Sequence, residues 1–452
     1  MNEGLTVVRY FDLVVIGSGV AGTLAAHKAK QAGLNVAVVD ERPFGGTCAL
    51  RGCDPKKILV GAAELVDWAR RMKGNGIDGE IKIDWKELMK FKRKFTEEMS
   101  KRIEQGFEKA GIETFHAHAR FLDERTLEVD GEKLEARFFL IATGARPRTL
   151  NILGEEYVIT SDQFLELDNL PEEIIFVGGG YISFELAHIA SRAGAKVKIL
   201  HRSERPLKNF EPYLVEKLLE ATREKGIEVI LNTPVVGVEK KGNRFIVNTA
   251  QNEAQFEADL VVHGAGRVPN IDGLGLENAN IEHDSRGIIV NEYMQSISNP
   301  RVYAAGDVAK GGLPLTPVAA VEASIATSNI IKGNNRKINY KGIPTAVFTI
   351  PPMASVGLRE EDAKRDSLNF TVKQGDTSRW YTSKRINLKH SAFKILIEKE
   401  TGKILGAHLL GHNADEVINI FALAIQLGLT AQDLKHRYYS YPTSSYDILY
   451  ML

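Results

Sequence analysis

The chain has 452 residues, enough for two or three domains that each bury a core of their own. Lys and Arg number 58, as do Asp and Glu, so the formal net charge is zero; charged residues make up 26% and apolar residues 44%. This balance excludes proteins that bind nucleic acid or membranes through bulk basic charge, and it excludes disordered and fibrous classes. No stretch approaches about 18 uninterrupted apolar residues, and the N-terminus around Glu3 does not resemble a signal peptide. We therefore expect a cytoplasmic protein that binds neither nucleic acid nor a membrane.

Residues 12–40 predict a first nucleotide-binding unit, which consists of a strand, a glycine turn, a helix and a second strand. The turn carries Gly17, Gly19 and Gly22, a spacing that lets backbone N–H groups at a helix N-terminus approach a pyrophosphate. Asp40 ends the second strand, where a carboxylate can accept hydrogen bonds from ribose hydroxyls. The unit therefore predicts a site for an adenine dinucleotide.

Cys48 and Cys53 are the only cysteines of the chain and lie five positions apart. A disulfide that closes so short a loop stabilises a fold little, and two cysteines without neighbouring histidines cannot complete a zinc site. We therefore predict redox chemistry and no metal site. Pro55 suits the first turn of a helix, so Cys53 would lie just before a helix N-terminus and near Lys56, where its thiolate form is favoured.

Two helices are expected next. The helix that begins at Pro55 is expected to present one apolar face, made of Ile58, Ala62, Leu65, Val66 and Ala69. The second runs from Trp85 to about Ala110 and is so rich in Lys and Glu that we expect a solvated helix face. An apolar strand over residues 138–142 then returns to the sheet and ends at Thr143 and Gly144.

Residues 174–202 repeat the first unit, with Gly178 and Gly180 in the turn and Ser183 at the third glycine position. An apolar strand over residues 260–263 completes this unit as the strand over 138–142 completes the first. Two such units imply two nucleotides. The second unit has no acid at the end of its second strand; that position begins a basic segment from His201 to Lys208. Basic side chains there attract a 2′-phosphate, which favours NADPH over NADH.

From about Lys341 the pattern changes. Apolar strands over residues 392–397 and 403–409 flank Glu-Thr-Gly and predict an antiparallel hairpin, and residues 416–427 predict an apolar helix. We expect a separate α+β domain whose apolar helix suits a subunit interface.

These motifs resemble the FAD-dependent pyridine nucleotide-disulfide oxidoreductase family, the group of glutathione reductase, lipoamide dehydrogenase and mercuric reductase. The resemblance covers nearly the whole chain and rests on residues 45–57, both glycine turns and the segments 141–144, 266–270, 302–307 and 315–319. It implies an α/β fold with two Rossmann-like dinucleotide-binding domains plus a C-terminal α+β dimerisation domain. The implied boundaries are an FAD-binding domain in 1–147 with a central part in 267–338, an NAD(P)H-binding domain in 148–266 and an interface domain in 339–452.

The resemblance also implies roles for single residues. Cys53 would be the thiol next to the flavin, and Cys48 the interchange thiol that attacks the substrate. Lys56 would lie near flavin N5 and pair with Glu185, while Tyr181 would cover the flavin until nicotinamide displaces it. One tightly bound FAD per subunit and NADPH would contact Gly17, Gly19, Val20, Ala21, Gly22, Asp40, Glu41, Gly46, Thr47, Lys56, Ala119, Thr143, Gly144, Gly178, Gly180, Tyr181, Ile182, Glu185, Arg202, Lys208, Gly266, Arg267, Gly306, Asp307 and Thr316.

The C-terminus departs from the family. Its members carry His-Pro-Thr-x-x-Glu there and donate the histidine, as general acid and base, across the dimer; this chain has Tyr441 and Tyr446 at the His and Glu positions. A phenol with a pKa of about 10 is a poor base at neutral pH. Three explanations are open: His436 or Tyr439 acts instead, the substrate needs little protonation, or the acceptor is a metal ion, a quinone or another electron sink. Tyrosines that only pack the dimer interface are a further interpretation.

We predict an NADPH-dependent FAD disulfide oxidoreductase, a homodimer with shared active sites, whose catalytic residues are Cys48, Cys53, Lys56, Glu185 and Tyr441. Electrons would pass from NADPH through FAD and the cysteine pair to a small oxidised acceptor of disulfide type. Glutathione disulfide is disfavoured because His27 and Ser324 stand where glutathione reductase holds arginines, and lipoamide because the histidine is missing. Mercuric reductases also carry the tyrosine but have an additional cysteine pair. The alternatives are a mercuric-reductase-like metal-ion reductase, a diaphorase or quinone reductase, and a low-turnover redox sensor.

Overall fold

A computed structural model describes residues 8–250 and 254–452; residues 1–7, where the sequence predicts no signal peptide, and residues 251–253 lie outside the described residues. The chain divides into two compact units. Unit 1 contains the residues up to Pro55, Phe91–Arg148 and Arg267–Tyr340, and unit 2 contains Lys56–Lys90, Thr149–Gly266 and Lys341–Leu452. Within the described ranges, no helix has the length and apolar character needed to cross a bilayer.

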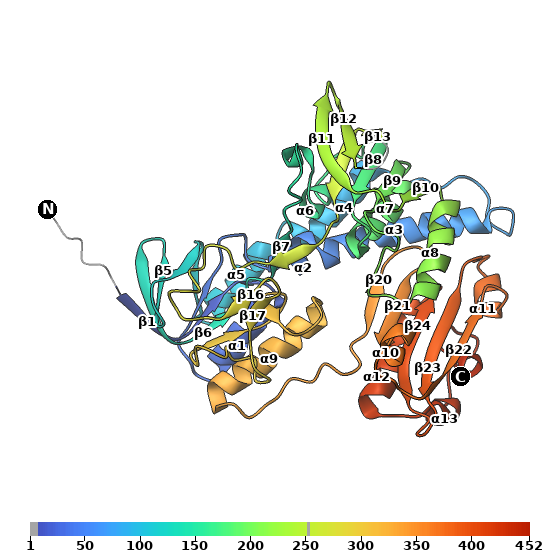
Figure 1. Ribbon diagram of the computed structural model, residues 1–452. Coiled ribbons are helices and arrows are strands. Elements are labelled where there is room, and N and C mark those ends of the chain that lie inside the picture. The colour runs from blue at the N-terminus through green and yellow to red at the C-terminus, as the bar shows by residue number, and fades with distance from the viewer. Residues whose placement is uncertain (1–7, 251–253) are drawn as a thin grey trace. The chain divides into compact units, whose positions relative to one another are not determined.

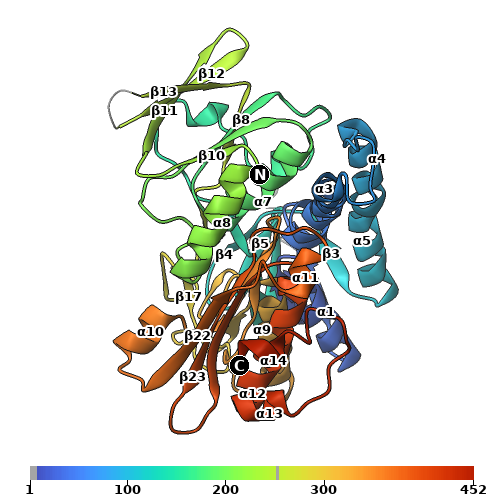
Figure 2. The same ribbon diagram turned by 90° about the vertical axis from the view of Figure 1, so that its right-hand side faces the viewer.

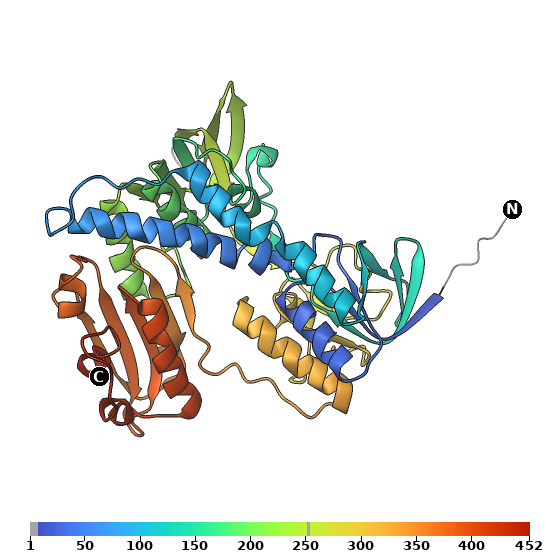
Figure 3. The same ribbon diagram turned by 180° about the vertical axis from the view of Figure 1, so that it is seen from behind.

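Unit 1 is built on a sheet with the strand order β3-β2-β1-β6-β5-β4, in which β18 also pairs with β6. The strands β1, β2, β3, β6 and β18 run parallel; β2 and the last four residues of β1 bury every side chain, as parallel strands covered on both faces do. The helices α1 and α9 lie side by side (Figure 3). The strands are β1 (Val8–Ile16), β2 (Val36–Val39), β3 (Glu113–Phe115), β4 (Ala119–Phe121), β5 (Thr126–Val129), β6 (Glu132–Ile141), β7 (Ala145–Pro147), β15 (Arg267–Pro269), β16 (His283–Asp284), β17 (Gly287–Ile289), β18 (Val302–Ala304) and β19 (Ala309–Lys310), and the helices are α1 (Val20–Gln31), α2 (Gly46–Arg51), α5 (Met99–Lys109) and α9 (Thr316–Lys332).

Unit 2 contains a second parallel sheet, with the strand order β10-β9-β8-β14, and an antiparallel sheet of β11, β12 and β13 (Figure 1). The order β10-β9-β8-β14 repeats β3-β2-β1-β6 strand for strand, which confirms the predicted internal repeat. The elements are η1 (Glu155–Tyr157), α6 (Ser161–Phe164), β8 (Glu173–Val177), α7 (Tyr181–Arg192), β9 (Lys196–Leu200), α8 (Pro212–Glu224), β10 (Ile227–Ile230), β11 (Val235–Lys241), β12 (Arg244–Thr249), β13 (Gln255–Ala258) and β14 (Leu260–His263).

The C-terminal part of unit 2 is an antiparallel sheet of order β20-β21-β24-β23-β22, and α12 packs on β21 and β24 (Figure 2). The predicted hairpin is β23 paired with β24, and the predicted apolar helix is α12, which begins two residues earlier than expected. The elements are β20 (Thr345–Val347), β21 (Met353–Gly357), α10 (Glu360–Arg365), β22 (Phe370–Asp376), α11 (Tyr381–Lys384), β23 (Ala392–Glu398), β24 (Ile404–Leu410), α12 (Ala414–Leu427), α13 (Ala431–Lys435) and α14 (Ile448–Met451). The α/β fold class is confirmed.

Two predictions about the helices between β2 and β3 are wrong in detail. The helix predicted from Pro55 is α3 (Cys53–Met72), whose buried apolar side chains are Leu59, Val60, Ala63 and Val66, while Leu65 is 70% exposed. Successive side chains point about 100° apart on a helix, so the core face is rotated away from the predicted one. The helix predicted over Trp85–Ala110 is two helices, α4 (Trp85–Thr96) and α5.

Candidate active site

The glycine turn after β1 brings backbone segments into contact that side chains would hold apart. Gly17 has a φ of +103°, and a Cβ atom there would lie 2.4 Å from the Ala142 carbonyl oxygen. A Cβ atom on Gly46 would lie 2.4 Å from Cα of Gly19. Gly19 precedes α1, and no side-chain hydrogen bond from it caps that helix. The first N–H groups of α1 therefore face a cradle of bare backbone, the arrangement that receives a pyrophosphate.

Asp40 stands at the end of β2, as the sequence predicts, and anchors the turn. Its Oδ2 accepts hydrogen bonds from the N–H and the hydroxyl of Ser18 at 2.8 and 2.6 Å, and its Oδ1 accepts from the N–H of Arg42 at 2.9 Å. A carboxylate has about four acceptor positions, so one is left for a ligand hydroxyl. The buried Ser18 hydroxyl also accepts from the N–H of Gly45 at 3.1 Å and so joins the turn to the cysteine loop. Sequence reasoning missed Ser18 because a serine between two glycines carries no signal of its own.

The two cysteines flank the break between α2 and α3. Cys48 lies in α2, Cys53 is the first residue of α3, and both are free thiols. Gly52 separates the helices, and a Cβ atom there would lie 2.9 Å from the Thr47 carbonyl oxygen, a distance that only glycine permits. Gly52 therefore allows the tight reversal that brings the two thiols into hydrogen-bond contact.

Thr316 contacts both sulfur atoms. Its hydroxyl donates to Cys48 Sγ at 3.3 Å and lies 3.6 Å from Cys53 Sγ. Thr316 is the first residue of α9, so the cysteine pair faces a helix N-terminus, whose partial positive charge stabilises a thiolate. The sequence resemblance placed Thr316 beside the flavin; its contacts with the sulfurs were not foreseen.

The pair is electrostatically asymmetric. The hydrogen bond with Cys53, followed by burial, raises the pKa of Cys48, and the charge of Asp54 raises it further, while the Thr316 hydroxyl lowers it. Cys48 therefore retains its proton, and a negative charge that the pair acquires would lie on Cys53. The Cys48 thiol also donates to Asp54 Oδ1 at 3.8 Å.

Lys56 and Glu185 form an ion pair in unit 2, with 3.0 Å between Nζ and Oε2 and side chains that are 12% and 5% exposed. The other Glu185 oxygen, Oε1, accepts from the N–H of Phe348 at 2.9 Å, and Lys56 Nζ lies 4.2 Å from the centre of the Phe348 ring. The buried carboxylate is therefore fully paired. Phe348, which follows β20, was not singled out from the sequence.

Glu322 in α9 is a second buried carboxylate that sequence reasoning missed. Its Oε2 accepts from the N–H of Gly306 at 2.7 Å and its Oε1 from the Tyr340 hydroxyl at 2.6 Å. Burial raises the pKa of Glu322 to about 7, with a further contribution from Asp307. Burial also raises the pKa of Asp307 itself. Glu322 thus holds the Gly306–Asp307 turn, which the resemblance assigns to FAD. A single acid in an apolar helix gave no signal in the sequence.

Several other predicted site residues contact or shape the backbone. The Thr143 hydroxyl donates to the Asn270 carbonyl at 2.6 Å, and Arg267 donates to the Ala145 carbonyl. Ala119 is buried in β4, and Glu41 is exposed. Three residues begin α1 (Val20, Ala21 and Gly22), and three glycines adopt positive φ (Gly144, Gly266 and Gly306).

The second glycine turn leaves an unpaired buried hydroxyl. Gly178 has a φ of +109°, and a Cβ atom there would lie 2.5 Å from the Gly264 carbonyl oxygen. Gly180 precedes α7, whose first turn contains Tyr181, 44% exposed, Ile182 and Ser183. Ser183 is fully buried, and its hydroxyl has no hydrogen-bond partner among the described residues. This hydroxyl lies against Gly264, where an added Cβ atom would come within 1.9 Å of it, so Ser183 packs the start of α7 closely against the turn after β14.

The basic segment after β9 is anchored by His201. Its Nδ1 accepts from the N–H of Gly179 at 3.0 Å and its Nε2 donates to the Arg205 carbonyl at 3.1 Å; burial lowers the pKa of His201, so the ring is neutral. Arg205 pairs with Glu361 at 3.3 Å. Arg202 and Lys208 are exposed and form no salt bridge within the part of the chain that the structure describes. These two cations are therefore available to an anion.

The C-terminal tyrosines form an aromatic row. The ring centroids of Tyr441 and Tyr446 lie 4.9 Å apart at 71°, and Tyr450 continues the row to Trp380. Tyr441 is 72% exposed in the single chain. The other predicted proton carriers are engaged: the Tyr439 hydroxyl donates to the Leu434 carbonyl at 3.1 Å, and the His436 ring is 3.1 Å from the Gln432 amide.

His27 and Ser324 each contact a neighbouring side chain of unit 1. The His27 ring stacks on Phe107 with a centroid distance of 5.2 Å, and Ser324 accepts from Lys28 Nζ through its carbonyl and hydroxyl oxygens. Neither position offers the cation that would bind a peptide carboxylate.

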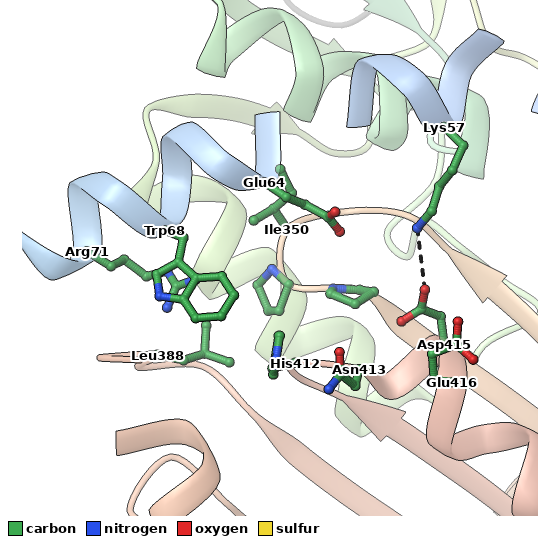
Figure 4. A pocket seen from close by; sticks show the side chains of 12 residues that line it. Lys57, Glu64, Trp68, Arg71, Ile350, Leu388, His412, Asn413, Asp415 and Glu416 are labelled. Carbon is green, nitrogen blue, oxygen red and sulfur yellow. Dashed lines mark hydrogen bonds and ion pairs between the residues drawn. The ribbon is translucent and has the colours of Figure 1, made fainter. Parts of the chain in front are cut away.

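A cavity of about 200 Å³ lies in unit 2 beside α3 and α12 (Figure 4). Lys57 points toward Asp415, at 3.4 Å, and burial raises the pKa of Glu64. None of the predicted site residues lines it; the lining residues are Lys57, Glu64, Trp68, Arg71, Ile350, Pro351, Pro352, Leu388, His412, Asn413, Asp415 and Glu416.

Comparison with known proteins agrees with this geometry. Residues 11–323 match the family described as pyridine nucleotide-disulphide oxidoreductase, and residues 343–450 match the dimerisation domain of that family. Mercuric reductase of Lysinibacillus sphaericus is 34% identical over 442 residues, which cover 96% of this chain and 80% of that protein. Glutathione reductase of Nostoc is 32% identical over 463 residues, with 98% and 99% covered, and dihydrolipoyl dehydrogenase of Bacillus subtilis is 33% identical over 445 residues, with 96% of each covered.

Among solved structures, a Cu(II) complex of a mutant of the HOCl-induced flavoprotein disulfide reductase RclA from Escherichia coli aligns with a TM-score of 0.89. The alignment covers 98% of this chain and 99% of that chain at 24% identity, which shows a common fold. The two glycine turns, at Gly17 and Gly178, fit the FAD and the NAD(P)H that members of the matched family bind. The chain is therefore an oxidoreductase of the pyridine nucleotide-disulphide oxidoreductase family, whose members bind FAD and use NAD(P)H.

Proposed function

We propose that the protein is an NADPH-dependent disulfide oxidoreductase that passes electrons through FAD and the Cys48–Cys53 pair to a small disulfide. The observation that carries this proposal is the cysteine pair itself, which is held across Gly52 and shares the Thr316 hydroxyl. FAD, when bound, would take a hydride from NADPH and supply two electrons to the cysteine disulfide.

Different residues of the chain would then bind FAD, bind NADPH and support catalysis. The cradle of Gly17, Gly19 and Gly46 would hold the FAD pyrophosphate, with Asp40 accepting from its ribose and Asp307 placed at the ribityl chain. The turn before α7 would hold the NADPH pyrophosphate, and Arg202 and Lys208 would bind the 2′-phosphate. We assign Lys56 and Glu185 to the catalytic set because their pair is buried and fully hydrogen-bonded.

Reduction breaks the bond between the cysteine sulfurs, after which Cys48 carries a proton and Cys53 the negative charge. Cys48 sulfur then bonds to one sulfur of the substrate, whose disulfide breaks, and the departing thiolate takes up a proton. The Cys53 thiolate next attacks Cys48 sulfur, the bond from Cys48 to the substrate sulfur breaks, and the disulfide is restored; the released thiolate takes up a proton from water. The raised pKa of Cys48 supports this assignment of the proton to Cys48 and of the negative charge to Cys53.

We further propose the domain organisation that the resemblance implies: FAD binding in 1–147 and 267–338, NADPH binding in 148–266 and dimerisation in 339–452. The match to a dimerisation domain supports a homodimer. In such a dimer the exposed Tyr441 would contribute to the partner's active site. A reducing cytoplasm would suit a redox pair that must cycle.

Metal-ion reduction is the second candidate. Relatives named mercuric reductase and a structural neighbour described as a Cu(II) complex favour it. Against it, the chain has two cysteines in all, and the described residues include no cluster of metal ligands. A disulfide is therefore the substrate class that these residues support best.

The test is a stopped-flow panel of acceptors with the FAD-loaded protein and NADPH or NADH. The panel holds glutathione disulfide, coenzyme A disulfide, lipoamide, mercuric and cupric ions and a quinone. We expect turnover with a disulfide and a higher kcat/KM for NADPH, and we expect Cys48→Ser to abolish disulfide turnover but to spare quinone reduction. Mercuric or cupric turnover without disulfide turnover would establish the second candidate, and cycling cysteines without any turnover would indicate a redox sensor.

A further inference from the structure

Disulfide exchange at Cys48 needs a group that takes and returns a proton. The family's histidine is Tyr441 in this chain, and Tyr439 is engaged by the Leu434 carbonyl. The groups that face the Cys48 thiol come from two elements: Cys53 and Asp54 at the start of α3, and Thr316 at the start of α9. Thr316 already donates to the sulfur, and Cys53 is the partner that carries the thiolate. Asp54 is thus the one carboxylate among them.

The Asp54 carboxylate is available to the Cys48 thiol. It is the second residue of α3, where an acid often stabilises the helix through the dipole. Its carboxylate nevertheless has one hydrogen-bond partner in the described part of the chain, the Cys48 thiol, at 3.8 Å from Oδ1. The reversal at Gly52 turns Cys48 back toward this carboxylate. The Asp54 side chain is exposed, so a proton that it accepts can exchange with water.

We propose that Asp54 is the general base and general acid of disulfide exchange at Cys48, the function for which this chain lacks the histidine. The inference rests on the proposed function. As Cys48 sulfur bonds to a substrate sulfur, its proton passes to Asp54 Oδ1 and the substrate disulfide breaks. The departing sulfur then takes that proton from Asp54. Atoms and charge balance, and no further oxidant or reductant is needed.

This base acts only while a substrate is attacked. At rest the negative charge of Asp54 opposes a second thiolate beside it and raises the pKa of Cys48. The resting pair therefore keeps the proton on Cys48 and the charge on Cys53. A carboxylate is also a weaker base than imidazole, so the exchange depends strongly on the leaving thiol. The structure thus points to disulfides whose thiols leave easily.

The experiment compares the wild type with Asp54→Asn, Asp54→Glu and the control Glu108→Gln, which changes an exposed carboxylate of α5 in the same unit. Each protein is reduced, and its reoxidation is followed with bis-hydroxyethyl disulfide, a poor leaving thiol, and with dithiobis-nitrobenzoate, a good one. Alkylation of Cys48 by iodoacetamide is measured in parallel by mass spectrometry over a range of pH. Thermal melts verify that each variant is folded.

We expect Asp54→Asn to slow the reaction with bis-hydroxyethyl disulfide about 100-fold, which is the contribution of a positioned acid–base group. The reaction with dithiobis-nitrobenzoate should slow much less. Alkylation of Cys48 should become faster in the same variant, because a repelling charge is gone. Asp54→Glu should recover part of the exchange rate, and Glu108→Gln should match the wild type. If the Asp54 carboxylate only stabilised α3, its replacement would not slow disulfide exchange and at the same time speed the alkylation of Cys48.

Equal rates of Asp54→Asn and wild type with both disulfides would overturn the role of Asp54 and leave the proposed function intact. A wild-type protein whose reduced cysteines never re-form a disulfide, seen as no loss of two hydrogens in mass, would overturn both. If Asp54→Asn melts early, Asp54→Glu carries the test, because it keeps the charge and moves the carboxylate by one methylene.

Discussion

Lys56 and Glu185 come from α3 and α7 and meet as an ion pair with 3.0 Å between Nζ and Oε2, out of reach of most solvent. Removal of one partner leaves a buried charge without compensation, which costs about 3–5 kcal/mol in comparable pairs. We expect Glu185→Ala to lower the free energy of unfolding by about 3 kcal/mol. Urea unfolding measures this. The exposed pair of Lys90 and Glu87 is the control, and Lys90→Ala should leave the transition unchanged. Equal effects of the two variants would contradict the importance of burial.

The asymmetry of the cysteine pair predicts the behaviour of Cys53→Ser. The hydrogen bond with Cys53 is the largest cause of the raised pKa of Cys48, and serine cannot carry the thiolate. The pKa of Cys48 should therefore fall toward its ordinary value. Iodoacetamide should alkylate Cys48 in this variant at a lower pH than in the reduced wild type. An alkylation profile that stays in place would mean that the two sulfurs do not share a proton.

Glu322 predicts a pH dependence of stability. Its pKa is raised from 4.5 in the unfolded chain to about 7 in the folded protein, so the folded state binds the proton more tightly. The resulting stabilisation, about 3 kcal/mol, is complete below pH 4.5 and is lost as the pH rises to 7. Urea unfolding at pH 5 and pH 8 measures it. Glu322→Gln should flatten the dependence, and a variant that retains the wild-type slope would assign it to another group.

The exposed cations of the basic segment predict the nucleotide preference. Arg202→Ala and Lys208→Ala should each lower kcat/KM for NADPH about tenfold, the worth of one charge-assisted hydrogen bond, and leave NADH nearly unchanged. Arg205→Ala is the matched control because Arg205 is paired with Glu361. Initial rates with both nucleotides give the ratio. Loss of activity with NADPH and NADH alike would place these residues outside 2′-phosphate recognition.

Tyr441 predicts a gain of function. Tyr441→His restores a base whose pKa lies near neutrality, so reduction of small disulfides should rise several-fold. The gain should be larger in an Asp54→Asn background, because the histidine would replace the missing proton carrier there. Steady-state rates of the single and double variants provide the measurement. No gain in either background would indicate that Tyr441 only packs against Tyr446.

Much of the architecture was accessible from local patterns. The glycines of both nucleotide turns are required by backbone conformation and close approach, and those requirements act over a few residues: Gly17 and Gly178 both have a φ near +105°, at +103° and +109°. The hairpin of β23 and β24 follows from alternation and a turn. The face of α3 was predicted wrongly because Leu65 is apolar but exposed, and burial depends on the neighbours that pack against a helix.

The sequence by itself determined two units with glycine turns, a closely spaced pair of cysteines and an α+β domain, because glycine geometry, cysteine spacing and strand periodicity are properties of short segments. Only the tertiary structure decided that Thr316 contacts both sulfurs, that Glu322 holds the Gly306 turn and that the Cys48 thiol faces Asp54. Such contacts join residues whose side chains meet only after helices pack and chain reversals close. No local pattern encodes that packing, since the same residues in an isolated helix would face water.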